Sequence, residues 1–459
     1  MVGGSEAQAQ GLTLGFDNDP VLTSGSAASQ ALWDGRAVSE DAGIVRISVG
    51  WSSVAPSTRP SGFSPANPAS PGYNWISTDA AVRELTNEGL KVLLNVTSAP
   101  TWAEGPHRPG SAQAGTWRPN PSQFASFATA AARRYDGHFP DPLHPGSFLP
   151  RISLWQPWNE PNLDDYLSPQ WTRSGSHWAP ASPGIYRGLL NSFYSAVKAV
   201  SPSNFVVESG TAPYGDPPGG PRMPPVQFDR YLFCLADNAR LSPTRCPDPA
   251  HLDAVDHHPY GIQGPLWHAL NPDDAAVPDM YKIARVLHAA ERDGHVLPRG
   301  PKGLWATEIS WDSDPPDPHG VPIQRQARWL EQAFYVLWRQ GVDTILWLQI
   351  ADSPPIPNYA STYQAGLYFM NGTPKPAAQA YEFPFVTQRL KGSRVQAWGR
   401  SPVGGRVTIE ELRGGQWKVV RRMSVGARRV FVTTLTLPGR GVLRAQVGGQ
   451  TSLVWTQGG

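Results

Sequence analysis

Eight short apolar runs, separated by longer amphipathic stretches, recur through most of this 459-residue sequence. They are rich in β-branched and aromatic residues, which favour strands. Strands that alternate with helices form a parallel sheet, and eight of them can close into a barrel. We therefore predict an α/β fold, a (β/α)8 TIM barrel over residues 11–387. The predicted strands are residues 12–16, 44–49, 91–96, 152–156, 205–208, 254–256, 303–307 and 344–348.

The stretches between these runs carry apolar residues at helical spacing, and several begin with Ser, Asp or Pro at a cap or first-turn position. We predict helices over residues 77–87, 121–135, 184–200, 279–293 and 323–339. Long loops rich in Pro, Gly and Trp follow several strands, at residues 100–120, 161–183, 212–225 and 312–321. In a barrel such loops lie at the C-terminal face of the sheet, where binding sites form.

The pattern changes after Thr387, where short alternating runs separated by Gly-rich turns replace helical periodicity. The runs are residues 394–398, 406–412, 417–423, 429–437 and 441–447. They predict a small antiparallel β-sandwich over residues 388–459. We expect it to pack against the barrel as a structural support, with sugar binding as the alternative.

Charge and composition limit the classes of molecule that this protein is expected to bind. The formal net charge is +2, and we take the 39 basic residues as scattered, so we expect no nucleic-acid or anionic-membrane partner. No apolar run approaches the roughly 20 residues of a membrane span. The 18 Trp residues suit loops that present flat surfaces to a sugar, although Trp also fills large cores.

Two features bear on the compartment. We expect a secreted protein. Residues 1–10 lack the charged and apolar regions of a signal peptide, so we expect that the targeting segment is not in this sequence. Cys234 and Cys246 could close a disulfide in an oxidising compartment, the alternative being two free thiols. No Cys or His pair has metal-ligand spacing, so we expect no metal.

Two glutamates stand at the ends of predicted strands. Glu160 follows the fourth strand in ISLWQPWNEPNL, and Glu308 ends the seventh in GLWATEISW. Retaining hydrolysis of a glycoside needs two carboxyl groups about 5–5.5 Å apart, one as acid and one as nucleophile. Facing strands of a barrel could bring these two together. Asn159, before Glu160, could hydrogen-bond the sugar 2-OH. A solvated loop carboxylate is the alternative for either glutamate alone.

At this point the sequence resembles a known group. The motif WNEPNL (158–163) resembles the acid/base motif of the retaining clan of TIM-barrel glycoside hydrolases (clan A), and its trailing Asn-Leu is most similar to family 39. The segment TEISW (307–311) is similar to the nucleophile strand of that clan. The resemblance covers roughly residues 11–385. It implies that Glu160 is the acid/base and Glu308 the nucleophile, with no metal or organic cofactor.

Other individual residues also match the pattern of the clan, one position at a time. Arg46 corresponds to an arginine that keeps the nucleophile ionised, and Tyr260 to a tyrosine that contacts it. His258 would line the pocket, and Trp347 would floor the subsite of the cleaved sugar. Further stacking surfaces could come from Trp51, Trp102, Trp117 and Trp311, although packing roles are as plausible for each. His257, beside His258, would point the other way.

One departure leaves the substrate open. The third strand reads Leu94-Asn95-Val96-Thr97-Ser98, without the His that many cellulase-type relatives carry at its end. The sequence thus predicts a retaining O-glycoside hydrolase acting on a β-linked plant or microbial glycoside or oligosaccharide. The alternatives are a non-catalytic carbohydrate-binding barrel and a transglycosylase, which shares the covalent intermediate and transfers it to a sugar.

Overall fold

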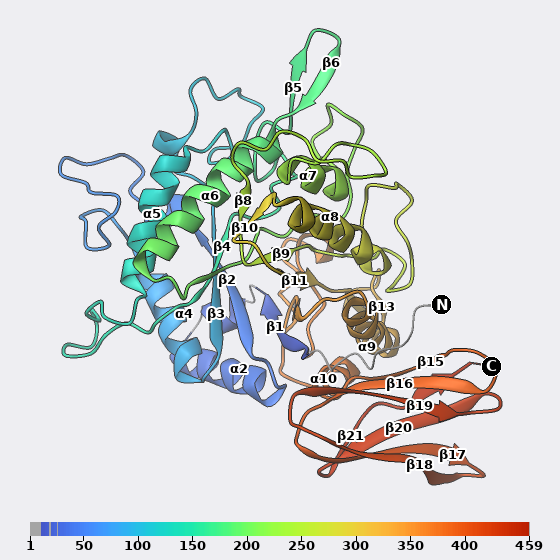
Figure 1. Ribbon diagram of the computed structural model, residues 1–459. Helices are drawn as coiled ribbons and strands as arrows, with labels where there is room; N and C mark the ends of the chain where they lie inside the picture. The colour runs from blue at the N-terminus through green and yellow to red at the C-terminus, as the bar shows by residue number, and fades with distance from the viewer. Residues whose placement is uncertain (1–10, 18–19, 25, 459) are drawn as a thin grey trace.

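A computed structural model describes residues 11–458 except 18, 19 and 25, and shows a barrel with a β-domain packed beside it (Figure 1). Each of the eight predicted strands is present. They are β1 (Thr13–Asp17), β2 (Ile44–Gly50), β3 (Lys91–Thr97), β4 (Leu154–Pro157), β7 (Phe205–Val206), β9 (Ala254–Asp256), β11 (Gly303–Ile309) and β14 (Thr344–Trp347). All are parallel, in the order β7-β4-β3-β2-β1-β14-β11-β9. A parallel bridge between Val207 and Ala254 links the two ends, which confirms the predicted barrel.

Helices surround this sheet. The predicted ones are α4 (Ile76–Asn87), α5 (Pro121–Arg134), α6 (Ser182–Val200), α8 (Met280–Asp293) and α9 (Ile323–Arg339). Three further helices were not predicted: α2 (Ala27–Ser39), α7 (Pro225–Leu232) and α10 (Pro376–Glu382). Short pieces are α1 (Pro20–Thr23), α3 (Trp51–Val54) and the 3₁₀ turns Thr101–Ala103, Val277–Asp279 and Tyr359–Ser361. Among the described residues, no helix is long and apolar enough to span a membrane.

Three two-stranded sheets lie in the loops of the barrel, among the described residues. A hairpin of β5 (Trp171–Ser174) and β6 (His177–Pro180) projects from the top of Figure 1. The other pairs are β8 (Ala250–His251) with β10 (Val296–Leu297), and β12 (Ser313–Asp314) with β13 (Val321–Pro322). The long loops therefore carry some regular structure of their own.

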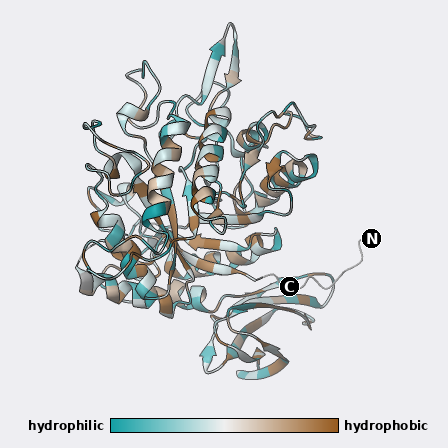
Figure 2. Cartoon of the chain, turned by 60° about the vertical axis from the view of Figure 1, so that its left-hand side comes forward, coloured by the Kyte–Doolittle hydropathy of each residue, from teal (hydrophilic) through white to brown (hydrophobic). Residues whose placement is uncertain are grey.

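The interior of the barrel changes character along the strands. At the N-terminal end an apolar layer fills it, comprising Ile44, Leu93, Val207, Ala254, Trp305 and Leu346. Figure 2 shows hydrophobic residues gathered along these strands. Side chains two residues apart share a face, so the next inward layer holds the residues two positions on. Most of that layer is polar, including Arg46, Asn95, Gln156, Asp256 and Thr307.

The chain after the barrel forms two antiparallel sheets, as predicted. One contains β15 (Phe385–Arg389), β16 (Arg394–Ser401) and β19 (Arg429–Thr436). The other contains β17 (Gly405–Arg413), β18 (Gln416–Val425), β20 (Gly441–Val447), β21 (Gln450–Thr451) and β22 (Trp455–Gln457). The domain contacts the barrel directly. Buried Arg400 pairs with Asp41 at 2.6 Å and donates to the Leu12 carbonyl at 2.9 Å.

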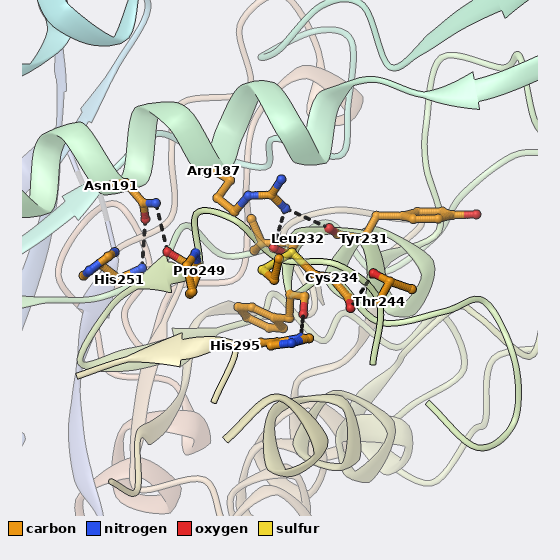
Figure 3. Close-up of a disulfide and its surroundings, with 11 residues drawn as sticks. Arg187, Asn191, Tyr231, Leu232, Cys234, Thr244, Pro249, His251 and His295 are labelled. Carbon is orange, nitrogen blue, oxygen red and sulfur yellow. Dashed lines mark hydrogen bonds between the residues drawn. A yellow bond between two sulfur atoms is a disulfide. The ribbon is translucent and has the colours of Figure 1, made fainter. Parts of the chain in front are cut away.

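The two cysteines form a disulfide, with 5.5 Å between their Cα atoms. Figure 3 shows it just after α7, next to α6. The carbonyl of Cys234 accepts a hydrogen bond from the Thr244 hydroxyl at 2.7 Å, and Arg187 of α6 donates to the carbonyls of Tyr231 and Leu232. The bridge therefore fastens a loop that helix α6 also holds.

Candidate active site

The two predicted glutamates converge at the C-terminal end of the barrel. Glu160 lies just after β4 and Glu308 lies in β11. One carboxylate oxygen of each and one ring nitrogen of His258 all lie within 4.8 Å of one another. The side chains of Glu160 and Glu308 are 12% and 15% exposed, so both are held in place yet remain open to a substrate.

His258 stands between the two carboxylates. Its Nδ1 lies 2.9 Å from Glu160 Oε1 and 3.5 Å from Glu308 Oε2. Burial lowers the pKa of His258, but the charge of Glu308 and the hydrogen bonds that the ring donates to Asp256 and Glu160 outweigh it and raise the pKa to about 10. The imidazole is therefore a cation at neutral pH and donates its Nδ1 proton to Glu160. His257 is turned away, bonded to Thr211 and the Ala275 carbonyl, as the alternation predicted.

Glu308 has two further partners. The hydroxyl of Tyr260 donates to Glu308 Oε1 at 2.6 Å, the contact that the resemblance implied. The Nη1 of Arg46 lies 3.7 Å from Glu308 Oε2, close enough for an ion pair. Glu308 thus lies against the phenol hydroxyl of Tyr260 and the charged side chains of Arg46 and His258.

Arg46 makes its hydrogen bonds to other residues. It donates to Asp17 at 2.7 Å, to Gln156 at 2.6 Å and to the Oδ1 of Asn159 at 2.7 Å. Burial raises the pKa of Asp17 to about 7 against the lowering effect of Arg46. The hydrogen bond from Arg46 to Asn159 also orients the amide of Asn159 beside Glu160, a role that was not predicted from the sequence.

The backbone around Glu160 is unusual. Trp158 and Glu160 have φ of 78° and 37°, left-handed values that non-glycine residues rarely adopt. Such strain persists only where neighbours impose it, often at functional sites. Here the amide of Asn95 donates to the Trp158 carbonyl, and the Glu160 N–H donates to the Gly210 carbonyl at 3.1 Å. Asn95, part of the departure from the cellulase pattern, thus shapes this turn.

The predicted aromatic platform is only partly realised. Trp347 is fully buried and packs against Phe334 of α9, so the expectation that it floors a sugar subsite is corrected. The reason is alternation, because Leu346 occupies the inward position. Trp51 is also fully buried, stacked on Phe127 of α5, and offers no surface to a sugar.

The other predicted aromatics lie closer to the surface. Trp311 keeps a small exposed area and contacts Trp329 and Trp347. Trp102 is partly buried and donates to the Pro56 carbonyl at 2.8 Å, in the loops above β2 and β3. Neither contacts Glu160 or Glu308 in an observed hydrogen bond.

Several residues of the site were not predicted from the sequence. Asp256 accepts hydrogen bonds from Gln156 at 2.8 Å and from the backbone and hydroxyl of Thr307, beneath His258. Two tyrosines, Tyr166 and Tyr363, lie near the glutamates. Burial and the charges of Glu160 and Glu308 raise the pKa of both hydroxyls, that of Tyr363 to about 12. The period-2 spacing that places Asp256 was readable in the sequence. The tyrosines come from loops and carried no such signal.

Glu160, His258 and Glu308 are also the group of described residues whose spacing could suit a metal ion. A histidine must be deprotonated to bind a metal. An ion at this position would therefore have to displace the proton that the raised pKa of His258 favours.

The comparisons with known proteins identify the fold. No family model and no curated protein matches the sequence. A family 39 glycoside hydrolase from the gut symbiont Bacteroides cellulosilyticus WH2 is 16% identical, with a TM-score of 0.55 over 94% of this chain and 81% of that one. A glucosidase from Croceicoccus marinus is 13% identical, with a TM-score of 0.52 over 97% of this chain and 98% of that one. The chain therefore shares the barrel fold of these glycoside hydrolases, as the sequence resemblance predicted.

Proposed function

We propose that this protein is a retaining O-glycoside hydrolase, with Glu160 as acid/base and Glu308 as nucleophile. The supporting observation is the approach of the two carboxylates to within 4.8 Å. Retaining enzymes hold their carboxyl groups about 5–5.5 Å apart, whereas inverting enzymes leave about 6.5–9.5 Å for a water molecule. The short separation favours retention.

In the first step, Glu308 attacks the anomeric carbon while Glu160 gives its proton to the departing oxygen. The glycosidic bond breaks and an ester to Glu308 forms. In the second step, Glu160 takes a proton from water, and the resulting hydroxide attacks the same carbon and releases Glu308. The anomeric configuration is inverted twice and so retained.

The neighbours have defined parts in this scheme. Tyr260 and Arg46 hold the carboxylate of Glu308 in position for attack. The hydrogen bond from His258 to Glu160 Oε1 holds the carboxyl group of Glu160 in place. Arg46 uses the oxygen of the Asn159 amide, which leaves the amide NH₂ to hydrogen-bond a sugar hydroxyl.

We propose a glycoside as substrate, because the fold is shared with a family 39 glycoside hydrolase and a glucosidase. The β linkage stays a prediction from the sequence. The test is a panel of aryl β-glucosides, β-xylosides and their α-anomers, with the first product anomer read by NMR. Retention is expected. An inverted product would contradict the double displacement. Binding of a glycoside without turnover would instead favour a non-catalytic sugar-binding protein, and transfer to an added acceptor sugar would favour a transglycosylase.

We also propose that the protein is secreted. The motivating observation is the Cys234–Cys246 disulfide, because such bridges persist in oxidising compartments. Fractionation of cells that express the full natural gene, with a thiol-alkylation assay of the two cysteines, tests this. Recovery of the reduced protein in the cytosol would contradict it.

A further inference from the structure

The two parts of the chain carry opposite charge. Residues 388–459 contain thirteen Lys and Arg residues and two Glu, a formal charge of +11. Because the whole chain carries +2, residues 1–387 carry −9. The expectation that the basic residues are scattered along the chain therefore needs correction. The β-domain holds a third of them in its 72 residues, with only two acidic residues beside them.

Part of this charge gathers on one sheet face. Directly paired residues of neighbouring strands share a face. Arg422 of β18 pairs with Thr408 of β17, which pairs with Gln446 of β20. Arg406 lies two residues before Thr408, and Arg444 two before Gln446, so both share this face. Val407 and Ile409, on the opposite face, are fully buried between the sheets.

This outer face is free of the barrel. Figure 1 shows β17 and β18 at the side of the β-domain farthest from the barrel helices. Arg406 and Arg422 are exposed, and neither has an ion-pair partner within the described part of the chain. Arg444 is paired with Glu410 at 2.8 Å and lies 4.1 Å over the ring of Trp417.

Beside these cations the surface is hollowed and polar. A depression of about 250 Å³ is lined by Arg406, Thr408, Gln446 and the turn 447–450. A hydroxyl and an amide next to free guanidinium groups suit a ligand that carries both sugar hydroxyls and anionic groups. Guanidinium binds carboxylate and sulfate through paired hydrogen bonds.

We propose that the outer face of β17, β18 and β20 binds an acidic polysaccharide and anchors the barrel to it. The catalytic site is distinct, since Glu160 and Glu308 lie at the C-terminal end of the barrel strands β4 and β11 and not in the β-domain. The anchoring polymer therefore need not be the one that is cleaved. This inference goes beyond the proposed hydrolase activity, and its test needs no turnover.

A polysaccharide fits this face better than a nucleic acid. Single-stranded nucleic acids bind to exposed aromatic rings that stack on the bases, but the ring of Trp417 is partly covered by Arg444. Double-stranded DNA is read by a helix or ribbon that enters a groove, whereas this surface is the face of a sheet.

The experiment measures binding of the full-length protein to polygalacturonate by titration calorimetry. Fully methyl-esterified polygalacturonate is the ligand control, because it keeps the sugar chain and removes the charge. We expect binding to the acidic polymer alone, weakened steeply by salt. Equal binding to both polymers would overturn the proposal.

The matched variants change the same net charge in two places. Arg406→Gln with Arg422→Gln should weaken binding about tenfold, since exposed charge contacts are individually modest. Arg240→Gln with Arg325→Gln, two exposed arginines of the barrel, should leave binding unchanged. Thermal melting verifies folding of each variant. An equal loss in both variants would overturn the assignment to this face.

Heparin, a duplex DNA oligonucleotide and phosphatidylserine vesicles complete the set of probes. Binding of heparin with the same variant pattern supports a surface for sulfated as well as carboxylated sugars. Tighter binding of DNA or of vesicles than of either polysaccharide would overturn the commitment to a polysaccharide.

Discussion

The barrel interior has two layers, one of apolar side chains and one of mostly polar, hydrogen-bonded side chains. The N-terminal layer, including Leu93, Trp305 and Leu346, is apolar and buried. One step along the same strands lies the polar layer of Arg46, Gln156 and Asp256, joined by hydrogen bonds and topped by the two glutamates. The same backbone thus carries stability at one end and chemistry at the other, as barrels generally do. Changes in the two layers should have separable effects.

The largest expected effect is on chemistry. Glu308→Gln should lower turnover of an aryl glycoside about ten-thousandfold, because the nucleophile is lost. The melting temperature should change little. Glu208 offers a matched control, since it also follows a barrel strand, is buried, and has its pKa raised by burial and by Asp229. Glu208→Gln should keep turnover. Equal losses in both variants would show that the measured effect is not specific to the site.

The second effect is on stability. Leu346→Ala in the apolar layer should lower the free energy of unfolding by about 2–5 kcal/mol, because it leaves a cavity. Denaturant unfolding measures this change. Leu390→Ala, at an exposed position of the β-domain, should cost about 0.5 kcal/mol or less. If the apolar layer could be truncated at no cost, the division between the two layers would not hold.

The third effect separates two adjacent histidines by pH. The folded-state pKa of His258 is raised from 6.5 to about 10, so its stabilising contribution is full below pH 6.5 and is lost as pH rises through 10. Burial lowers the pKa of His257 to about 4, so its contribution is present above pH 6.5 and is lost as pH falls through 4. Unfolding free energies measured across this range should show His258→Gln flattening only the alkaline limb. A flattened acid limb would contradict the assignment.

The smallest effect concerns the loops above the polar layer. Tyr363→Ala should raise KM about fivefold with a smaller change in kcat, the scale of one lost aromatic contact. Tyr281→Ala, a similarly exposed tyrosine on α8, is the control and should leave both constants unchanged. Steady-state kinetics on one aryl glycoside suffice. An unchanged KM for Tyr363→Ala would remove this tyrosine from the substrate site.

Much of the site was readable from the sequence. The strand runs located all eight barrel strands, and the motif around Glu160 with the strand around Glu308 predicted the two carboxylates that the structure brings together. Tyr260 was placed correctly against Glu308. These predictions succeeded because strand periodicity and a short motif are local properties.

The errors have a common physical cause. Trp347 was assigned to the sugar subsite from the resemblance, and Trp51 to a stacking surface with packing as an equal alternative, yet both are buried against the surrounding helices. Which face of a strand end points inward depends on the register between neighbouring strands. A single sequence does not reveal that register, and a large aromatic ring fits a core as well as it fits a sugar.

The sequence by itself determined the barrel, the β-domain, the two glutamates and, through a count of its charges, the opposite signs of the two parts. Only the tertiary structure decided that His258 bridges the glutamates, that Arg46 reaches Asn159, and which arginines of the β-domain lie free on one face. The reason is that strand pattern and charge are written along the chain. Contacts between residues a hundred positions apart arise only when the barrel closes.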